Sequence, residues 1–168
     1  MNYKEAKEDF IQSWGAMGSS WGINRTMAQI HALLMISPKP LVAEQIINEL
    51  GTSQGNTNVN LRELISWGLV KRVHKAGDRK EYYEAIKDVH KIAVLILKER
   101  RKKELEPLIQ MLNEYTSVEI DKKDSEEKAF SEMVRSIQKF SKKVDGVFEM
   151  AIKADETWIG KTLTKFLK

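Results

Sequence analysis

The fold is decided by residues 41–84, which read LVAEQIINELGTSQGNTNVNLRELISWGLVKRVHKAGDRKEYYE. Within residues 41–50, apolar side chains recur at i, i+3, i+4 and i+7, a spacing typical of a short amphipathic helix, and Gly51 follows where such helices end. Residues 52–53 can cap a second helix, which Gly68 ends. Two short helices joined by a tight glycine turn are the helix-turn-helix pattern.

After Gly68 the periodicity changes from that of a helix to that of a strand. Residues 69–74 and 80–84 are rich in β-forming side chains, and residues 75–79 between them have the composition of a hairpin loop. A hairpin directly after a helix-turn-helix is the arrangement of a winged helix. We therefore predict a mostly α fold, a winged helix-turn-helix with a two-stranded β wing and a helical dimerisation region.

The rest of the chain has helical periodicity, and the sequence predicts three regions. Residues 1–22 form an N-terminal dimerisation helix, residues 23–87 the winged helix-turn-helix, and residues 88–168 a C-terminal helical dimerisation region. Asn24 can cap the second helix of the chain, and the two prolines within residues 37–40 stop it.

Both flanking regions carry apolar stripes. One stripe of the first helix, which Gly22 closes, holds Phe10, Trp14, Met17 and Trp21. Near the other end, apolar residues alternate at spacings of three and four: Phe130, Met133, Ile137, Phe140, Val144, Val147 and Ala151. Such a heptad favours packing against another helix, including one from a second subunit. We also predict a boundary or kink at Pro107, a polar connection over residues 121–127, and a last short helix that Asp155 caps and that carries Trp158, Ile159, Leu163 and Phe166.

Composition narrows the function classes. The chain has 168 residues, 28 Lys plus Arg against 24 Asp plus Glu, and no cysteine, which excludes disulfides, thiolate metal sites and cysteine nucleophiles. Residues 1–10 contain no apolar signal-peptide core, and no apolar run approaches the length of a membrane span, so we expect a cytoplasmic protein without a membrane partner.

Positive charge is concentrated in the winged helix. Residues 53–83 hold six basic and three acidic side chains. Lys and Arg on such a unit can neutralise phosphates and release counterions, which is the sequence-independent part of affinity for double-stranded DNA. A solvated charged face is the alternative that the charge pattern alone leaves open.

The second helix of the pair begins with residues that suit base recognition better than helix stability. Asn costs on the order of half a kcal/mol per interior position relative to Ala, yet this helix contains three. Carboxamides can bond bidentately to adenine, Arg62 can contact guanine or phosphate, and Val59 can touch a thymine methyl group. On a helical wheel centred on Leu61, the residues that point away from the core are Gly55, Asn56, Val59, Asn60, Arg62 and Glu63, whereas Thr57, Leu61, Leu64 and Ile65 point inward. The predicted DNA-binding residues of this helix are Ser53, Gln54, Asn56, Asn58, Val59, Asn60 and Arg62. A merely polar surface helix is the alternative.

Four blocks, at residues 21–34, 51–64, 67–74 and 77–80, resemble in order the GbsR-type branch of the MarR-like transcriptional regulators. The resemblance covers about residues 10 to 95. It implies a homodimeric winged-helix repressor whose second helix of the pair enters successive major grooves while the wing reaches the minor groove. A two-fold dimer implies a pseudo-palindromic operator.

The same resemblance extends to single residues. Asp78-Arg79 matches the wing motif of the family, which implies that Arg79 is the minor-groove arginine, flanked by His74, Lys75 and Lys80. Gln54 departs from the basic residue that the family has there.

Some members of that branch govern choline and glycine betaine metabolism, which implies a quaternary ammonium effector. Trp14 and Trp21 lie seven residues apart on one helical stripe, and aromatic faces are what a cage for such a cation requires. Packing in the core or at a dimer interface is the alternative for these tryptophans.

The sequence contains no motif for metal binding or catalysis. His31, His74 and His90 have no metal-ligand spacing, no phosphate-binding or nucleophile motif occurs, and no nucleophile and base can be paired, so we expect no enzyme, metal or cofactor. The sequence therefore predicts a sequence-specific DNA-binding regulator. A winged helix used only as a protein-interaction module is the alternative.

Overall fold

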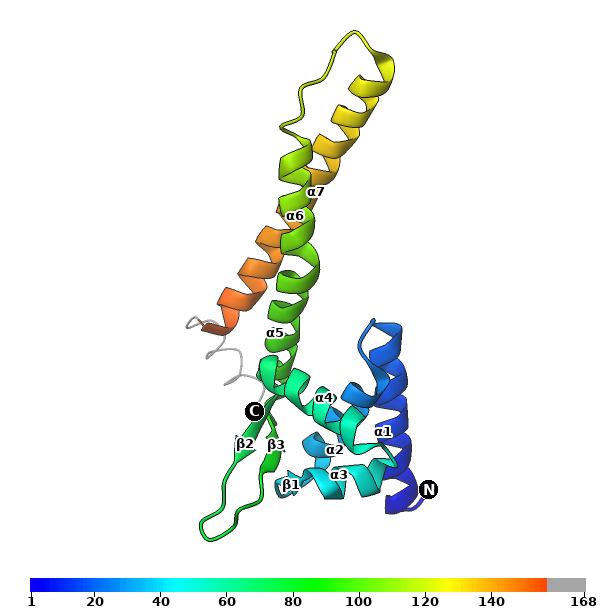
Figure 1. The fold of residues 1–168 in the computed structure, drawn as a ribbon, viewed down its shortest axis with the longest axis vertical. Coiled ribbons are helices and arrows are strands. Elements are labelled where there is room, and N and C mark those ends of the chain that lie inside the picture. Colours follow the sequence, from blue (N-terminus) through cyan, green and yellow to red (C-terminus); the bar gives the residue numbers. More distant parts are fainter. Residues whose placement is uncertain (157–168) are drawn as a thin grey trace. The chain divides into compact units, whose positions relative to one another are not determined.

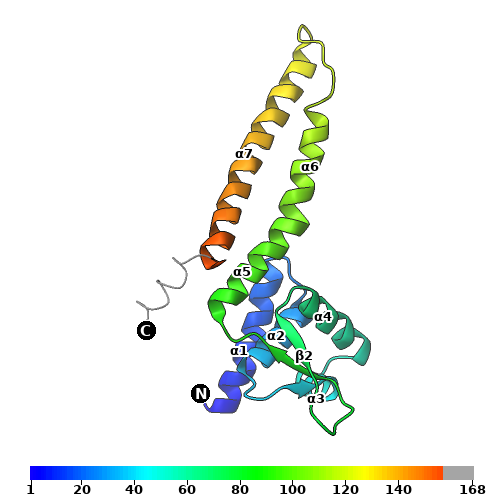
Figure 2. The ribbon, with the colours of Figure 1, turned by 90° about the vertical axis from the view of Figure 1, so that its left-hand side faces the viewer.

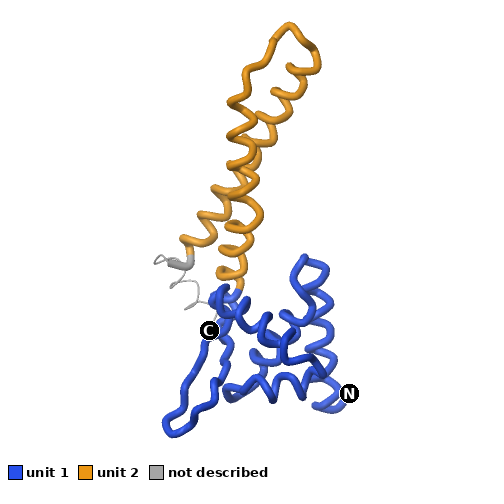
Figure 3. Tube along the Cα trace, viewed as in Figure 1, with its two compact units in different colours: residues 1–92 blue, residues 93–168 orange. Residues whose placement is uncertain are grey.

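The computed structural model describes residues 1–156 (Figure 1). The chain divides into two compact units, unit 1 over residues 1–92 and unit 2 from residue 93 onward (Figure 3). No helix in the described part of the chain is both long and apolar enough to cross a membrane.

Unit 1 is the predicted winged helix with one helix added in front. Its elements are α1 (Tyr3–Ser20), α2 (Arg25–Ile36), β1 (Leu41–Val42), α3 (Ala43–Leu50), α4 (Gln54–Ser66), β2 (Val70–Val73), β3 (Tyr82–Ala85) and the start of α5 (Val89–Arg100). The mostly helical fold class is confirmed. In Figure 1 the hairpin of β2 and β3 projects away from the helices of unit 1 as a wing.

The sheet has three antiparallel strands in the order β1-β3-β2. Leu41 pairs with Tyr83 and Val42 with Tyr82, so β1 adds an edge strand to the wing. The prediction that the α3 helix begins at Leu41 is therefore wrong by two residues. Two residues pair as a strand only where a partner strand is in place, and β3 comes forty residues later in the chain, outside the range of any local pattern.

The core of unit 1 forms where α2 meets α3 and α4. Met27, Ile30 and Leu34 of α2 are buried, and Ile46 and Leu61 complete the centre. These side chains recur at three and four residues along each helix, so each helix buries one face.

The predicted caps and the helix-ending glycines are confirmed. Asn24 Oδ1 accepts a hydrogen bond from the backbone N–H of Met27 at 3.1 Å, and Ser53 Oγ accepts from Asn56 N at 3.3 Å. The glycines at the ends of α1, α3 and α4 all have φ between +63° and +74°, a region that favours glycine (Gly22, Gly51 and Gly68).

The first helix packs on α2 through a face that buries Ile11 and two glycines rather than through its aromatic stripe. A Cβ on Gly15 would lie 2.6 Å from Gln29 Cγ, and a Cβ on Gly18 would lie 2.6 Å from Ala28 Cβ. The two glycines therefore let the backbones approach closely. Phe10, Met17 and Trp21 are exposed within the chain, so the apolar stripe is not the inner face of α1.

Unit 2 is a helical hairpin. After α5, a π-helical turn η1 (Arg101–Leu105) leads into α6 (Glu106–Tyr115), and α7 (Ser125–Glu156) returns antiparallel beside α6 (Figure 2). The boundary predicted at Pro107 is confirmed, since the regular α-helix is interrupted immediately before this proline, which has no N–H to donate.

The connection predicted over residues 121–127 is shorter, because Asp124 Oδ1 accepts from the backbone N–H groups of Glu126 and Glu127 and so starts α7 at Ser125. The cap predicted at Asp155 is wrong, because α7 continues through Glu156. The last short helix, with Trp158, Ile159, Leu163 and Phe166, lies outside the described residues.

Candidate nucleic-acid interface

Helix α4 is locked into unit 1 by its back face. Thr57, Leu61 and Leu64 are at most 1% exposed, and Thr57 Oγ1 shares a 2.7 Å hydrogen bond with Thr52 Oγ1 in the turn before the helix. Most of the predicted DNA-binding residues of α4 are on the opposite, open face: Ser53, Gln54, Asn56, Val59 and Arg62 are exposed, and Asn58 is half-buried. The outer face thus presents polar side chains around the single apolar side chain of Val59.

The expectation that Asn60 points away from the core is wrong. Asn60 is 5% exposed. It lies three residues after Thr57 and four before Leu64, so at 100° per residue it belongs to the same buried face. A helical wheel centred on these two residues instead of on Leu61 places Asn60 inward.

The buried amide of Asn60 contacts Asn56. Asn60 Nδ2 donates to the backbone carbonyl of Asn56 and to Asn56 Oδ1, both at 2.8 Å. Asn56 Nδ2 in turn donates to Thr26 Oγ1 of α2 at 3.2 Å. The exposed carboxamide of Asn56 is therefore held from two sides.

The tip of the wing is ordered by one carboxylate. Asp78 Oδ1 accepts from the backbone N–H of Lys80 at 2.9 Å, and Oδ2 accepts from the hydroxyl of Tyr82 at 2.6 Å. These hydrogen bonds lower the pKa of Asp78 and raise that of Tyr82, because both favour the ionised carboxylate and the protonated phenol. Gly77, with φ of +80°, makes the turn that this arrangement needs.

The basic residues of the wing differ in whether they form an ion pair. Lys71 pairs with Glu84 at 3.0 Å, and Arg72 with Glu81 at 3.8 Å, along the strands. None of the ion pairs within the described residues involves the exposed tip cations Lys75, Arg79 and Lys80, and His74 beside them is also exposed. Positive charge is thus concentrated at the end of the wing, which a count of basic residues along the sequence does not reveal.

Comparison with known families accounts for this arrangement. Residues 21–81 match the model of the MarR family, a segment that spans α2, α3, α4 and the wing up to the start of β3. These residues are therefore similar to the winged helix of that family. The GbsR-type branch is a finer assignment that this match does not reach.

Two similar proteins extend the comparison. The chain is 29% identical over 76 residues to the HTH-type transcriptional regulator MmpR5 of Mycobacterium tuberculosis (strain ATCC 25618 / H37Rv), a match over 45% of this chain and 46% of that protein. The chain thus matches about half the length of this curated relative. A crystal structure of a transcriptional regulator superposes with a TM-score of 0.67 at 17% identity, over 90% of this chain and 98% of the other, and shows the same fold.

One basic residue of the winged helix was missed by sequence reasoning. Lys39, in the linker after α2, lines a cleft of about 750 Å³ together with the wing residues Lys75, Lys80 and Tyr82. The sequence pattern that could have indicated Lys39 is its position between Pro38 and Pro40, because the flanking prolines restrict the backbone at that point.

The remaining predicted site residues lie away from α4 and the wing in the chain. Trp14 is half-buried and contacts Phe10 with ring centroids 5.7 Å apart and the ring planes tilted by 30°, whereas Trp21 is 56% exposed at the end of α1. His31 is 3% exposed and its Nε2 has no hydrogen-bond partner among the described residues. Among the side chains that the structure describes, no group of three or more potential metal ligands occurs.

Proposed function

We propose that this protein is a sequence-specific DNA-binding transcriptional regulator of the GbsR-type branch, a homodimer that represses from a pseudo-palindromic operator. The observation that carries the proposal is the outer face of α4, where carboxamides and Arg62 are exposed while the back face is fixed in the core. A surface built for protein docking has a central apolar area, and this face exposes only Val59.

The two halves of the interface have different tasks. Gln54, Asn56 and Asn58, with Val59 and Arg62, face base edges, which is where hydrogen-bond patterns distinguish sequences. The wing carries Lys75, Arg79 and Lys80 at an ordered tip, and these contact phosphates and the minor groove irrespective of the base sequence.

The homodimer is supported by the free face of α7. Helix α7 turns Val134 and Ser141 toward its own hairpin, both buried. Five large residues of the predicted heptad are instead 42–67% exposed: Phe130, Met133, Ile137, Phe140 and Val147. A self-complementary apolar stripe of this length fits a second copy of the same helix, so we assign dimerisation to residues 88–168, together with the exposed aromatic stripe of α1 within residues 1–22.

The effector that we propose is a quaternary ammonium compound such as choline. The rings of Phe10 and Trp14 on α1 have centroids 5.7 Å apart, and Trp21, seven residues after Trp14 on the same stripe, is 56% exposed. Aromatic rings of this kind attract cations. Titration of choline should change tryptophan fluorescence and raise the melting temperature in the wild-type protein, and Trp14→Leu should abolish both responses.

Fluorescence anisotropy on the duplex upstream of the coding region and on a shuffled copy, each across a salt series, tests the proposed function. We expect salt-dependent binding with a clear preference for the native duplex. Equal binding to both duplexes would remove the sequence-specific part of the proposal. Absence of binding at low salt, together with a stoichiometric protein partner in a DNA-free pull-down, would establish the protein-interaction module instead.

A further inference from the structure

The carboxamide of Asn56 is held by a chain of hydrogen bonds that begins outside the exposed face of α4. Asn56 is exposed at the start of the helix, Asn60 is buried one turn later, and Thr26 lies at the start of α2, a different helix. The three side chains are joined in the order Asn60, Asn56, Thr26. One donor on α4 and one acceptor on α2 thus act on the same amide.

The hydrogen-bond partners fix which way each amide faces. The backbone carbonyl of Asn56 can only accept, so the atom of Asn60 that lies 2.8 Å from it must be the nitrogen. That nitrogen also faces the side chain of Asn56, whose oxygen must therefore point toward Asn60 and whose nitrogen must point toward Thr26. A free asparagine side chain has two amide orientations of similar energy, and here one of them is selected.

Counting donors and acceptors shows what remains for a ligand. A carboxamide has two N–H donors and one oxygen with two lone pairs. Asn56 uses one N–H on Thr26 Oγ1 and one lone pair on Asn60 Nδ2. One donor and one acceptor are left, which is the pair that the N7 acceptor and N6 amino group of adenine require in the major groove.

We propose that Thr26 and Asn60 are positioning residues that hold the carboxamide of Asn56 in the orientation that reads adenine. Preference for one A·T base pair in each half-site then depends on two side chains that do not touch the DNA. This inference rests on the proposed function, because it assigns a base to a residue of the DNA-binding face. Burial of Asn60 supports it, since the donor of a buried amide needs a partner and finds it on Asn56.

Selection from a pool of randomised duplexes, followed by sequencing, tests the proposal with the full-length protein. Asn56→Ala should lower the preference for A·T at one position of each half-site about tenfold. Valine has nearly the shape of threonine, with a methyl group in place of the hydroxyl. Thr26→Val should therefore lower the preference at that same position by about three- to tenfold. Thr26→Ser, which keeps the hydroxyl, is the matched control and should stay close to the wild-type profile.

Asn60→Leu is the second variant, because leucine fills a similar buried volume without a donor. It should lose preference at the same position as Thr26→Val, with the circular dichroism spectrum and the affinity for a shuffled duplex unchanged. A Thr26→Val profile equal to that of the wild type, or a uniform loss of affinity for all duplexes in both variants, overturns the positioning role. A G·C pair at the position that Asn56→Ala affects overturns the assignment to adenine.

The same experiment separates the two levels of inference. If the wild-type protein enriches no duplex, the proposed function fails and the positioning role fails with it. If the wild type enriches a site and Asn56→Ala weakens the preference at one position, but Thr26→Val and Asn60→Leu behave as the wild type, the positioning role alone fails.

Discussion

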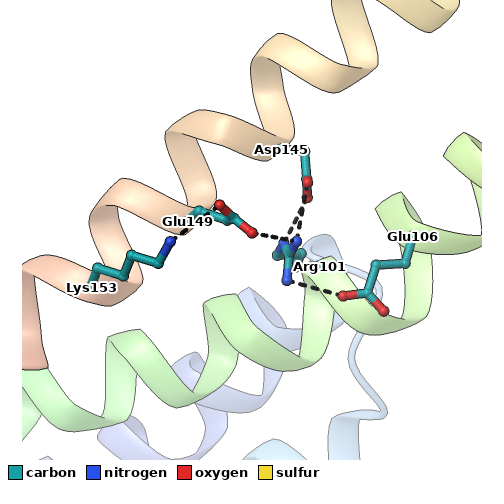
Figure 4. A network of polar contacts seen from close by, with 5 residues as sticks. All are labelled: Arg101, Glu106, Asp145, Glu149 and Lys153. Carbon is teal, nitrogen blue, oxygen red and sulfur yellow. Dashed lines mark hydrogen bonds and ion pairs between the residues drawn. The ribbon is translucent and has the colours of Figure 1, made fainter.

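Arg101 and Asp145 form a two-point ion pair, in which Arg101 Nε lies 2.6 Å from Asp145 Oδ1 and Nη2 lies 3.0 Å from Oδ2 (Figure 4). The same guanidinium contacts Glu149 and Glu106, each at 3.1 Å. Hydrogen bonding to Asp145 raises the pKa of Arg101, so the guanidinium stays charged in this setting. Since Arg101 starts the π-helical turn and Asp145 lies on α7, the pair joins the two arms of the hairpin that carries the apolar stripe.

Replacing Arg101 should destabilise unit 2. The side chains of Arg101 and Asp145 are 24% and 22% exposed, so the pair is stronger than a surface ion pair. We expect Arg101→Met to lower the free energy of unfolding by about 1–2 kcal/mol, because the carboxylates on α7 would lose their shared cation. Urea unfolding measures this loss. Lys128→Met removes an exposed pair with Glu132 and is the control, with an expected change of a few tenths of a kcal/mol. Equal losses of stability in the two variants would show that the ion pair of Arg101 and Asp145 stabilises unit 2 no more than a surface pair does.

A charge on the free face of α7 should separate the proposed dimer. Phe140 is 67% exposed within the chain, so Phe140→Glu leaves the packing of the hairpin intact but places a carboxylate in the apolar stripe. We expect a monomer by sedimentation velocity at concentrations where the wild type is a dimer, together with weaker operator binding. Lys139→Glu, at the neighbouring exposed position outside the stripe, should remain a dimer. A dimer in both variants would assign dimerisation to other residues.

Stability should fall on acidification because of His31. Burial, reinforced by the charge of Lys87, lowers the pKa of His31 to about 4, whereas an unfolded histidine has a pKa near 6.5. The unfolded state therefore takes up a proton at a higher pH than the folded state. The stabilisation is present above pH 6.5 and is lost as the pH falls toward 4, on the order of 2–3 kcal/mol by about pH 4.5.

The matched variant isolates this effect from the titration of carboxylates. His31→Gln has no charge to gain in this range, so its unfolding free energy should decline less between pH 7 and pH 4.5 than that of the wild type. His74→Gln changes an exposed histidine and should follow the wild-type curve. Parallel curves for the wild type and His31→Gln would show that the imidazole of His31 titrates alike in both states.

Local sequence patterns predicted most of unit 1, and the elements that they missed depend on contacts between distant residues. Caps and glycines act within one turn of a helix, so Asn24, Ser53 and Gly51 located the ends of three helices correctly. The β1 strand depends on β3, and the close packing of α1 depends on Gly15 meeting Gln29 of another helix. Such pairings are tertiary and leave no periodicity in a single segment.

The sequence predicted which residues belong to the candidate site, but not which of them are buried or which contact one another. Residue type singled out the carboxamides of α4, and the family resemblance singled out the cations of the wing tip. The burial of Asn60 depends on the rotational phase of the helix, which an error of one residue shifts by about 100°. The contact between Asn56 and Thr26 joins residues thirty positions apart, so only the folded chain brings it out. For the same reason the sequence could not show that Lys71 and Arg72 form ion pairs whereas the cations of the wing tip do not.

The order of the wing tip should matter for DNA affinity separately from its charge. Arg79→Ala removes a cation, so we expect weaker binding to native and shuffled duplexes alike and a salt slope lower by about one. Tyr82→Phe removes only the hydroxyl that donates to Asp78, so the net charge is unchanged while the turn around Gly77 loses one of its two side-chain hydrogen bonds. We expect the Tyr82→Phe affinity to fall about three- to tenfold on both duplexes with the salt slope of the wild type. Anisotropy titrations across the salt series measure both quantities for each variant. If Tyr82→Phe binds as tightly as the wild type, Arg79 reaches its phosphates without help from the ordered tip, and the hydrogen bond from Tyr82 to Asp78 serves the fold of the hairpin only.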